Sequence, residues 1–181
     1  MKEPSKGELL QKLALRYPSL ALDPSAVQII SHIQSIGRII SANLSAQLAD
    51  YGLSEGKFYV LGFLLSRETF EHEDPSPSDI AENLGVTRGT ITGLLDGLER
   101  DDYIVRYDDS HDRRALRIRM TDKARGFIDD FLHRCVLTNR QTVPLSDAEK
   151  QTLLELLARI ESAAAETLGT PTGMHCIIDE A

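Results

Sequence analysis

The chain has 181 residues, of which 41% are hydrophobic and 27% charged, as in an ordinary globular protein able to bury a core of its own. Its net charge of −8 argues against a protein that coats nucleic acid nonspecifically, because neutralisation of phosphate charge dominates that kind of affinity. The sequence contains neither a run of about twenty apolar residues nor a basic-then-apolar leader, so we expect a cytoplasmic protein with no membrane partner.

Residues 1–22 are expected to form a loosely attached leader. Ser5 and Glu8 have the spacing of a capping box, which predicts a short helix that ends before Tyr17-Pro18. Asp23-Pro24 then begins a long helix that runs to about residue 51. Its apolar residues recur every three or four positions, so one stripe is predicted to be buried along its length: Ile29, Ile33, Ile36, Ile40, Leu44 and Leu48. A helix of about 27 residues is about 40 Å long, which is long for a compact monomer and favours packing against a second subunit.

A further amphipathic helix begins after Ser54 and ends in a polar loop at residues 68–76. This loop carries His72-Glu73-Asp74, which could be metal ligands. Adjacent polar residues on a loop are more often solvated, so we expect no metal site there.

Two short helices around a glycine turn follow. Ser76 can cap the first, Pro77 suits its first position, and the helix extends to about residue 84. Gly85-Val86 makes a tight turn, and Thr87 can cap a second helix that extends to about residue 100. This arrangement is the signature of a helix-turn-helix.

A hairpin is predicted next. Residues 103–107 form a β-prone run, residues 108–114 a polar loop, and residues 115–120 alternate between apolar and small or basic side chains. One face of the hairpin would be buried and the other basic, and its loop would be the wing of a winged helix-turn-helix. Between residues 86 and 120 seven arginines balance seven acidic residues, so this module is neutral within an acidic chain.

Two helices are expected after the hairpin. Thr121 can cap the first, and Ser146 with Glu149 has capping-box spacing for the second, which ends at Gly169.

We therefore divide the chain by function into parts, namely a leader (1–22), a helical dimerisation region (23–52 and 121–169), a winged helix-turn-helix (53–120) and a tail (170–181). The predicted fold class is mainly α with a small β-hairpin, the DNA-binding module being flanked by N- and C-terminal dimerisation helices.

The ordered motifs of residues 53–125 resemble those of the MarR family (multiple antibiotic resistance regulators), bacterial transcription regulators of the winged helix-turn-helix type. The motifs are Leu84-Gly85-Val86-Thr87-Arg88-Gly89-Thr90-Ile91-Thr92, Leu94-Leu95-Asp96, Leu98-Glu99-Arg100, Val105-Arg106, Asp112-Arg113-Arg114-Ala115 and Met120-Thr121-Asp122-Lys123. The resemblance implies a homodimer that binds double-stranded DNA at a pseudo-palindromic operator, usually as a repressor. It also implies release by a small effector, often an aromatic or phenolic anion.

Candidate DNA contacts lie on the second helix and on the hairpin. Base reading is assigned to Thr87, Arg88, Thr90 and Thr92; an alternative for Arg88 is an intramolecular pair with Asp79 or Glu82. A helical wheel places three glycines on the solvent side, where close approach to DNA would explain them: Gly89, Gly93 and Gly97. At the wing, Arg113 and Arg114 are candidates for the minor groove, Asp112 for orienting one of them, and Arg106 and Arg117 for phosphate contacts.

Candidate effector-lining residues are His32, Arg38, Tyr59 and Arg67, each of which is also explained by ordinary packing or exposure. A redox-responsive regulator acting through Cys135 is an alternative, although a free cysteine on an apolar helical face is usually inert. A second alternative is a winged-helix interaction module without DNA binding. No catalytic motif is recognisable, so we expect no enzyme, and we expect no cofactor or metal.

Overall fold

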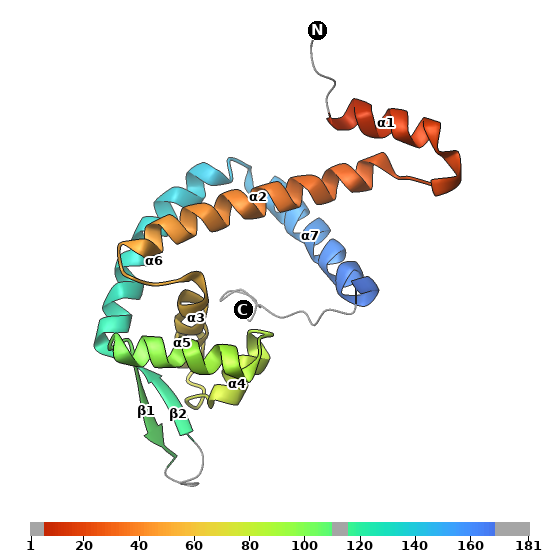
Figure 1. The fold of residues 1–181 in the computed structure, drawn as a ribbon. Coiled ribbons are helices and arrows are strands. Elements are labelled where there is room, and N and C mark those ends of the chain that lie inside the picture. Colours follow the sequence, from red (N-terminus) through yellow and green to blue (C-terminus); the bar gives the residue numbers. More distant parts are fainter. Residues whose placement is uncertain (1–5, 110–115, 169–181) are drawn as a thin grey trace. The chain divides into compact units, whose positions relative to one another are not determined.

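Figure 1 shows a computed structural model of the chain, which describes residues 6–109 and 116–168. The chain divides into two compact units, Met1–Glu55 and Gly56–Ala181. The described part of the first unit consists of helices, whereas the second combines helices with a two-stranded sheet. The predicted fold class, mainly α with a small β-hairpin, is confirmed.

The first unit contains α1 (Lys6–Arg16), the short 3-10 helix η1 (Pro18–Leu20) and α2 (Pro24–Ala49). Asp23-Pro24 begins α2 as predicted, and the Asp23 side chain caps the helix by accepting hydrogen bonds from the backbone N–H groups of Ser25 (2.9 Å) and Ala26 (3.1 Å). The chain leaves α2 through Gly52, whose φ of +66° is easily adopted only by a residue without a Cβ atom. With 26 residues, α2 is about 39 Å long.

The periodicity of α2 predicted that its apolar stripe is buried. In the described residues of a single chain, most of this stripe is exposed. Only Leu48 is fully buried, and Leu44 is half-buried. The other four residues of the stripe are 38% to 54% exposed, namely Ile29, Ile33, Ile36 and Ile40. The pattern therefore identifies an apolar face that the described residues of one chain leave largely exposed.

The second unit contains a helix-turn-helix followed by a hairpin. Its elements are α3 (Glu55–Thr69, whose first residue belongs to the first unit), α4 (Pro77–Asn83), α5 (Arg88–Arg100), β1 (Ile104–Asp108), β2 (Leu116–Met120), α6 (Asp122–Thr142) and α7 (Asp147–Leu168). In Figure 1 the hairpin projects from the end of α5. The predicted winged helix-turn-helix is thus present. Its helices and strands begin and end within one or two residues of the predicted positions.

The core of the second unit lies where α3, α4 and α5 meet the hairpin and the start of α6. Fully buried side chains come from each of these elements: Val60, Leu61, Ile80, Ile91, Leu95, Leu98, Ile104, Ile118, Ala124 and Phe131. Phe127 packs against Phe131 with ring centroids 5.5 Å apart. Burial of large apolar side chains from six elements holds α5 in a defined position.

The hairpin is antiparallel, with Ile104 opposite Met120 and Arg106 opposite Ile118. Its alternation is as predicted, since Ile118 and Met120 are buried and Arg119 is exposed. The N–H of Ile118 donates to the carbonyl of Pro75 at 3.0 Å, which attaches the loop before α4 to the edge of β2.

Predicted caps begin both C-terminal helices. Thr121 accepts a hydrogen bond from the N–H of Ala124, and Ser146 and Glu149 form both bonds of a capping box. Much of the apolar surface of α7 is exposed in one chain: Leu153, Leu154, Leu156, Leu157 and Ile160. No helix in residues 6–109 and 116–168 has the length and apolar character needed to cross a membrane.

Candidate nucleic-acid interface

The turn between α4 and α5 is built by local signals. Ser76 and Asp79 form a reciprocal capping box at the start of α4, with bonds of 2.8 and 3.2 Å. At the other end, Gly85 has a φ of +62° and its N–H donates to Glu82, while Val86 donates to Ala81. These are the two hydrogen bonds of a Schellman motif, so α4 ends where α5 must begin.

The N-terminus of α5 presents an exposed polar surface. Thr87 caps the helix by accepting a bond from the N–H of Thr90 at 3.2 Å, and the hydroxyl of Thr92 donates to the carbonyl of Arg88 at 2.9 Å. Both hydroxyls are therefore engaged by the helix itself. Arg88 is exposed, and no carboxylate in the described part of the chain pairs with its guanidinium, including Asp79 and Glu82.

The three glycines of α5 do not share one environment. Gly89 and Gly93 are exposed, and a Cβ atom added at Gly93 would meet no atom within 4 Å outside the local helix backbone. Gly97 is buried, so its predicted place on the solvent side is wrong. A Cβ atom there would lie 2.7 Å from Cε of Lys57 on α3, which means that Gly97 makes room for a packed side chain rather than for DNA.

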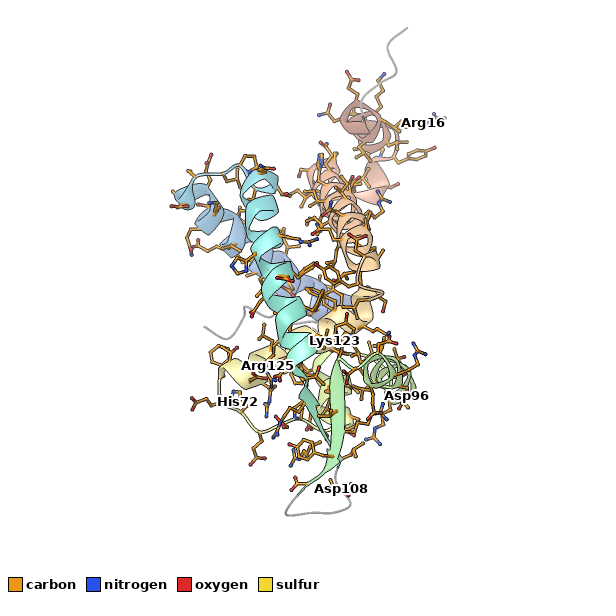
Figure 2. All side chains as sticks on the ribbon, turned by 90° about the vertical axis from the view of Figure 1, so that its left-hand side faces the viewer. Arg16, His72, Asp96, Asp108, Lys123 and Arg125 are labelled. Atoms are coloured by element: carbon orange, nitrogen blue, oxygen red, sulfur yellow. The ribbon has the colours of Figure 1, made fainter. Side chains whose placement is uncertain are left out.

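Arg106 is turned toward α5. Its Nη2 lies 2.6 Å from Oδ1 of Asp96, and its Nε lies 3.4 Å from Oε2 of Glu99 without the alignment of a hydrogen bond. Figure 2 shows Asp96 on the outer side of α5 and Asp108 at the wing end of β1. The predicted phosphate contact of Arg106 therefore has an intramolecular competitor.

The loop before α4 is bound to the basic face of the hairpin. Asp74 accepts bonds from the Tyr107 hydroxyl and from Nε of Arg119 (2.6 Å), and its carbonyl accepts from Arg117 (2.9 Å). Arg119 also lies over the Tyr107 ring, 4.9 Å from its centroid. Burial, followed by the bond to the Asp74 carboxylate, raises the pKa of Tyr107. Asp74 is thus a structural anchor and not a solvated loop residue.

Arg117 belongs to the same cluster. Its Nε lies 2.7 Å from Oδ2 of Asp109, and its Nη2 lies 3.7 Å from Oε2 of Glu73. The bond to Asp109 is the main cause that raises the pKa of Arg117. Of the four candidate hairpin arginines, Arg106 and Arg117 are therefore held in ion pairs. The other two, Arg113 and Arg114, lie with Asp112 outside the described residues.

The four candidate effector-lining residues fall in different units. His32 and Arg38 are exposed on α2 of the first unit. In the second unit Tyr59 lies next to Phe58, with ring centroids 5.9 Å apart, and Arg67 donates two bonds to the carbonyl of Glu73. Arg67 therefore already supports the loop before α4. The predicted pocket stays a prediction. Cys135 lies in α6, and its side chain falls outside the described part of the structure.

A capped helix-turn-helix with a hairpin directly after its second helix defines a winged helix-turn-helix protein. Residues 51–115 match the model of the MarR family. The chain is 33% identical over 113 residues to the HTH-type transcriptional repressor YetL of Bacillus subtilis, covering 61% of this chain and 65% of YetL. It is 29% identical over 156 residues to the HTH-type transcriptional regulator PecS of Dickeya dadantii, covering 86% of this chain and 92% of PecS.

Solved structures share the fold. The transcriptional regulator SlyA has a TM-score of 0.64 at 22% identity, covering 77% of this chain and 95% of SlyA. A complex of MepR from S. aureus with DNA has a TM-score of 0.63 at 23% identity, covering 72% of this chain and 92% of MepR. Residues 51–115 thus match the MarR family, and the named proteins to which the chain is similar are transcription regulators.

Proposed function

We propose that this protein is a homodimeric, sequence-specific transcription repressor that a small aromatic or phenolic effector releases from its operator. The observation that carries the proposal is the exposed face of α5 at Arg88 and Gly93. Arg88 is exposed and its guanidinium has no carboxylate partner among the described residues, and Gly93 is an exposed backbone position at which no side chain blocks approach. Both features suit a helix that enters the major groove.

The environment of each residue suggests its role in DNA binding. Arg88 reads a guanine, the methyl groups of Thr90 and Thr92 touch thymine methyls, and Thr87 positions the helix end. Gly93 lets the α5 backbone approach the groove. At the wing, Arg113 and Arg114 enter the minor groove and Asp112 orients one of them. Arg106 and Arg117 act mainly by holding the hairpin in place.

Dimerisation is supported by the unpartnered apolar faces of two long helices. The exposed isoleucines of α2 and the exposed leucines of α7 form stripes along helices of 26 and 22 residues. Contiguous apolar faces of this extent mark interaction sites on soluble proteins. A two-fold dimer would present two α5 helices to successive major grooves of a pseudo-palindrome, about 34 Å apart.

The effector would act by favouring one of two dimer conformations, which requires only a difference in its affinity for them. We propose His32 and Arg38 as contacts from α2, and Tyr59 and Arg67 from α3. An imidazole and two guanidinium groups suit an aromatic carboxylate or phenolate. Salicylate and 4-hydroxybenzoate are suitable first probes, tested as a concentration-dependent loss of DNA binding in native protein and in His32→Ala and Arg38→Ala variants.

Selection from a random DNA pool tests the DNA-reading part. The native protein should enrich a pseudo-palindrome with half-sites about ten base pairs apart. Arg88→Ala should relax the preference at one base of each half-site, costing about 1 to 3 kcal/mol there. Arg100→Ala, at the far end of α5 and 74% exposed, is the matched control and should leave the base preference unchanged. Failure to enrich any sequence would contradict the proposal.

A further inference from the structure

The hairpin is attached to the rest of its unit on both of its faces. Side chains alternate between the two faces of a strand, and the register places Arg106 on one face and Tyr107 and Arg119 on the other. On the first face, Arg106 pairs with Asp96 on α5. On the second face, Tyr107 and Arg119 both bind Asp74, which lies in the loop between α3 and α4. The hairpin is therefore held from two sides.

The carboxylate of Asp74 joins the two strands. Its Oδ2 accepts hydrogen bonds from the hydroxyl of Tyr107 on β1 and from Nε of Arg119 on β2, the latter at 2.6 Å. Arg119 also donates from Nη2 to the Tyr107 oxygen at 3.2 Å and lies over the Tyr107 ring. The three side chains thus bind one another in a closed set, which is stiffer than a single ion pair. The side chain of Asp74 is only 25% exposed, so salt screens the set less than a fully exposed pair.

The backbone around Asp74 is fixed as well. Arg117 donates to the Asp74 carbonyl at 2.9 Å, and the N–H of Ile118 donates to the carbonyl of the fully buried Pro75 at 3.0 Å. Arg67, near the end of α3, donates two bonds to the carbonyl of the residue before Asp74. The loop then leads directly into α4, the first helix of the helix-turn-helix. The Asp74 carboxylate is therefore a fixed point against which the hairpin is held.

We propose that Asp74 is a positioning residue for DNA binding, whose carboxylate holds the hairpin at the angle at which its loop meets the DNA. A hairpin of two five-residue strands is only marginally stable by itself, so its angle depends on such attachments. Holding it in the bound orientation before DNA arrives lowers the cost of binding. The inference rests on the proposed function and adds a residue that acts on DNA binding without touching DNA.

Substitution of Asp74 gives a test in which two explanations predict opposite signs. Asp74→Asn removes one negative charge from a protein of net charge −8, so electrostatics alone predicts tighter binding to DNA. The proposal predicts that affinity for the selected operator falls about fivefold or more, within the usual range for coupled residues. Glu73→Gln is the matched control, because it removes the same charge from a neighbouring side chain that is 86% exposed. It should bind as the native protein does or slightly more tightly. Tighter binding by Asp74→Asn would overturn the proposal.

A second variant tests the same contact without a change of charge at neutral pH. Tyr107→Phe removes the hydroxyl that donates to Asp74 and keeps the ring beneath Arg119. Affinity for the operator should fall about twofold or more, with an unchanged salt dependence, because no phosphate contact is lost. Tyr17→Phe, at a tyrosine 46% exposed in the first unit, is the control and should bind as the native protein does. Native affinity of Tyr107→Phe would count against the proposal.

A double-mutant cycle shows whether Asp74 acts through the wing. Asp74→Asn is combined with the Arg113→Ala, Arg114→Ala substitutions, and binding is measured at low salt so that weak complexes remain measurable. Because the wing arginines are then absent, the further loss caused by Asp74→Asn should shrink to less than about twofold. Equal losses with and without the two arginines would show that Asp74 only stabilises the fold, and would overturn the proposal.

Amide hydrogen exchange without DNA separates this inference from the proposed function. The amides of residues 104–108 and 116–120 should exchange at least about threefold faster in Asp74→Asn than in Glu73→Gln, because the hairpin loses one of its two attachments. If the native protein binds no DNA but this change occurs, Asp74 holds the hairpin and the repressor function fails. If hairpin exchange is the same in the two variants, the inference is wrong whatever the DNA affinities are. Circular dichroism confirms that each variant is folded.

Discussion

Arg106 Nη2 lies 2.6 Å from Oδ1 of Asp96, which ties strand β1 to the outer face of α5. The side chain of Arg106 is 21% exposed and that of Asp96 is 60% exposed, so the pair is partly open to solvent. An arginine in this place either contacts phosphate or fixes the angle between the hairpin and the helix. The two roles differ in a measurable way, because only a phosphate contact releases counterions.

Arg106→Gln should therefore leave the salt dependence of DNA binding unchanged while lowering the free energy of unfolding by about 0.5 to 1 kcal/mol, as for a partly exposed ion pair. Binding titrations over a salt series and urea denaturation measure the two effects. A fall of about 1 in the slope of log K against log salt, with native stability, would instead assign Arg106 to phosphate.

Replacement of the Thr87 cap should weaken the start of the recognition helix. Thr87→Ala removes the oxygen that accepts the N–H of Thr90, so the free energy of unfolding should fall by about 1 kcal/mol. Thr87→Ser keeps that oxygen and should retain most of the stability. Urea denaturation of both variants checks this. Equal losses in the two variants would mean that the methyl group, and not the cap, is what matters.

The Lys57–Asp101 pair predicts a pH dependence. The pKa of Asp101 is lowered to about 2 in the folded protein, from 3.8. A carboxylate with a lowered pKa contributes stability that is present above about pH 4 and is lost as the pH falls toward 2. The difference in urea midpoint between native protein and Lys57→Met should accordingly be largest near neutral pH and shrink below pH 4. A difference that does not change between pH 7 and pH 3 would contradict this, and Lys150→Met provides the baseline for loss of an exposed lysine.

A charge on the α2 stripe should disrupt the proposed dimer. Ile36 is 54% exposed in one chain, and if the stripe is covered by a second copy, Ile36→Glu buries an unpaired carboxylate. Sedimentation velocity should then show a monomer, or a dimer weakened by at least about tenfold, which corresponds to 1.4 kcal/mol. Val105→Glu, 44% exposed on β1, is the matched control and should remain dimeric. If Ile36→Glu dimerises with native affinity, the interface must lie on another surface.

Local signals in the sequence predict the helix-turn-helix well. The caps at Ser76 and Thr87 form the bonds that their residue types predict, and Gly85 takes the left-handed conformation expected of the turn. These features depend on residues within four positions of one another. The alternation of the second strand is equally local, because Ile118 and Met120 need only a single buried face.

Contacts between distant residues have no such signal. A helical wheel with one core face places Gly97 in solvent, but α5 also packs against α3, and Lys57 covers the glycine. The pair that Lys57 forms with Asp101 joins residues 44 positions apart, and Asp74 meets Arg119 across 45 positions. From the sequence alone, such charged residues are predicted to be exposed, because only the fold brings them into contact. For α2, periodicity identifies an apolar face but not which molecule covers it.

The most direct test of the account is a salt series of binding to the DNA upstream of the protein's own gene and to the selected operator, with an Arg113→Ala, Arg114→Ala variant beside the native protein. The native protein should bind tightly and with a steep salt dependence, and the variant should lose at least about tenfold in affinity and lower the slope by about 1 to 2. A folded dimer that binds neither DNA specifically at low salt, or a variant that binds as the native protein does, would contradict the account.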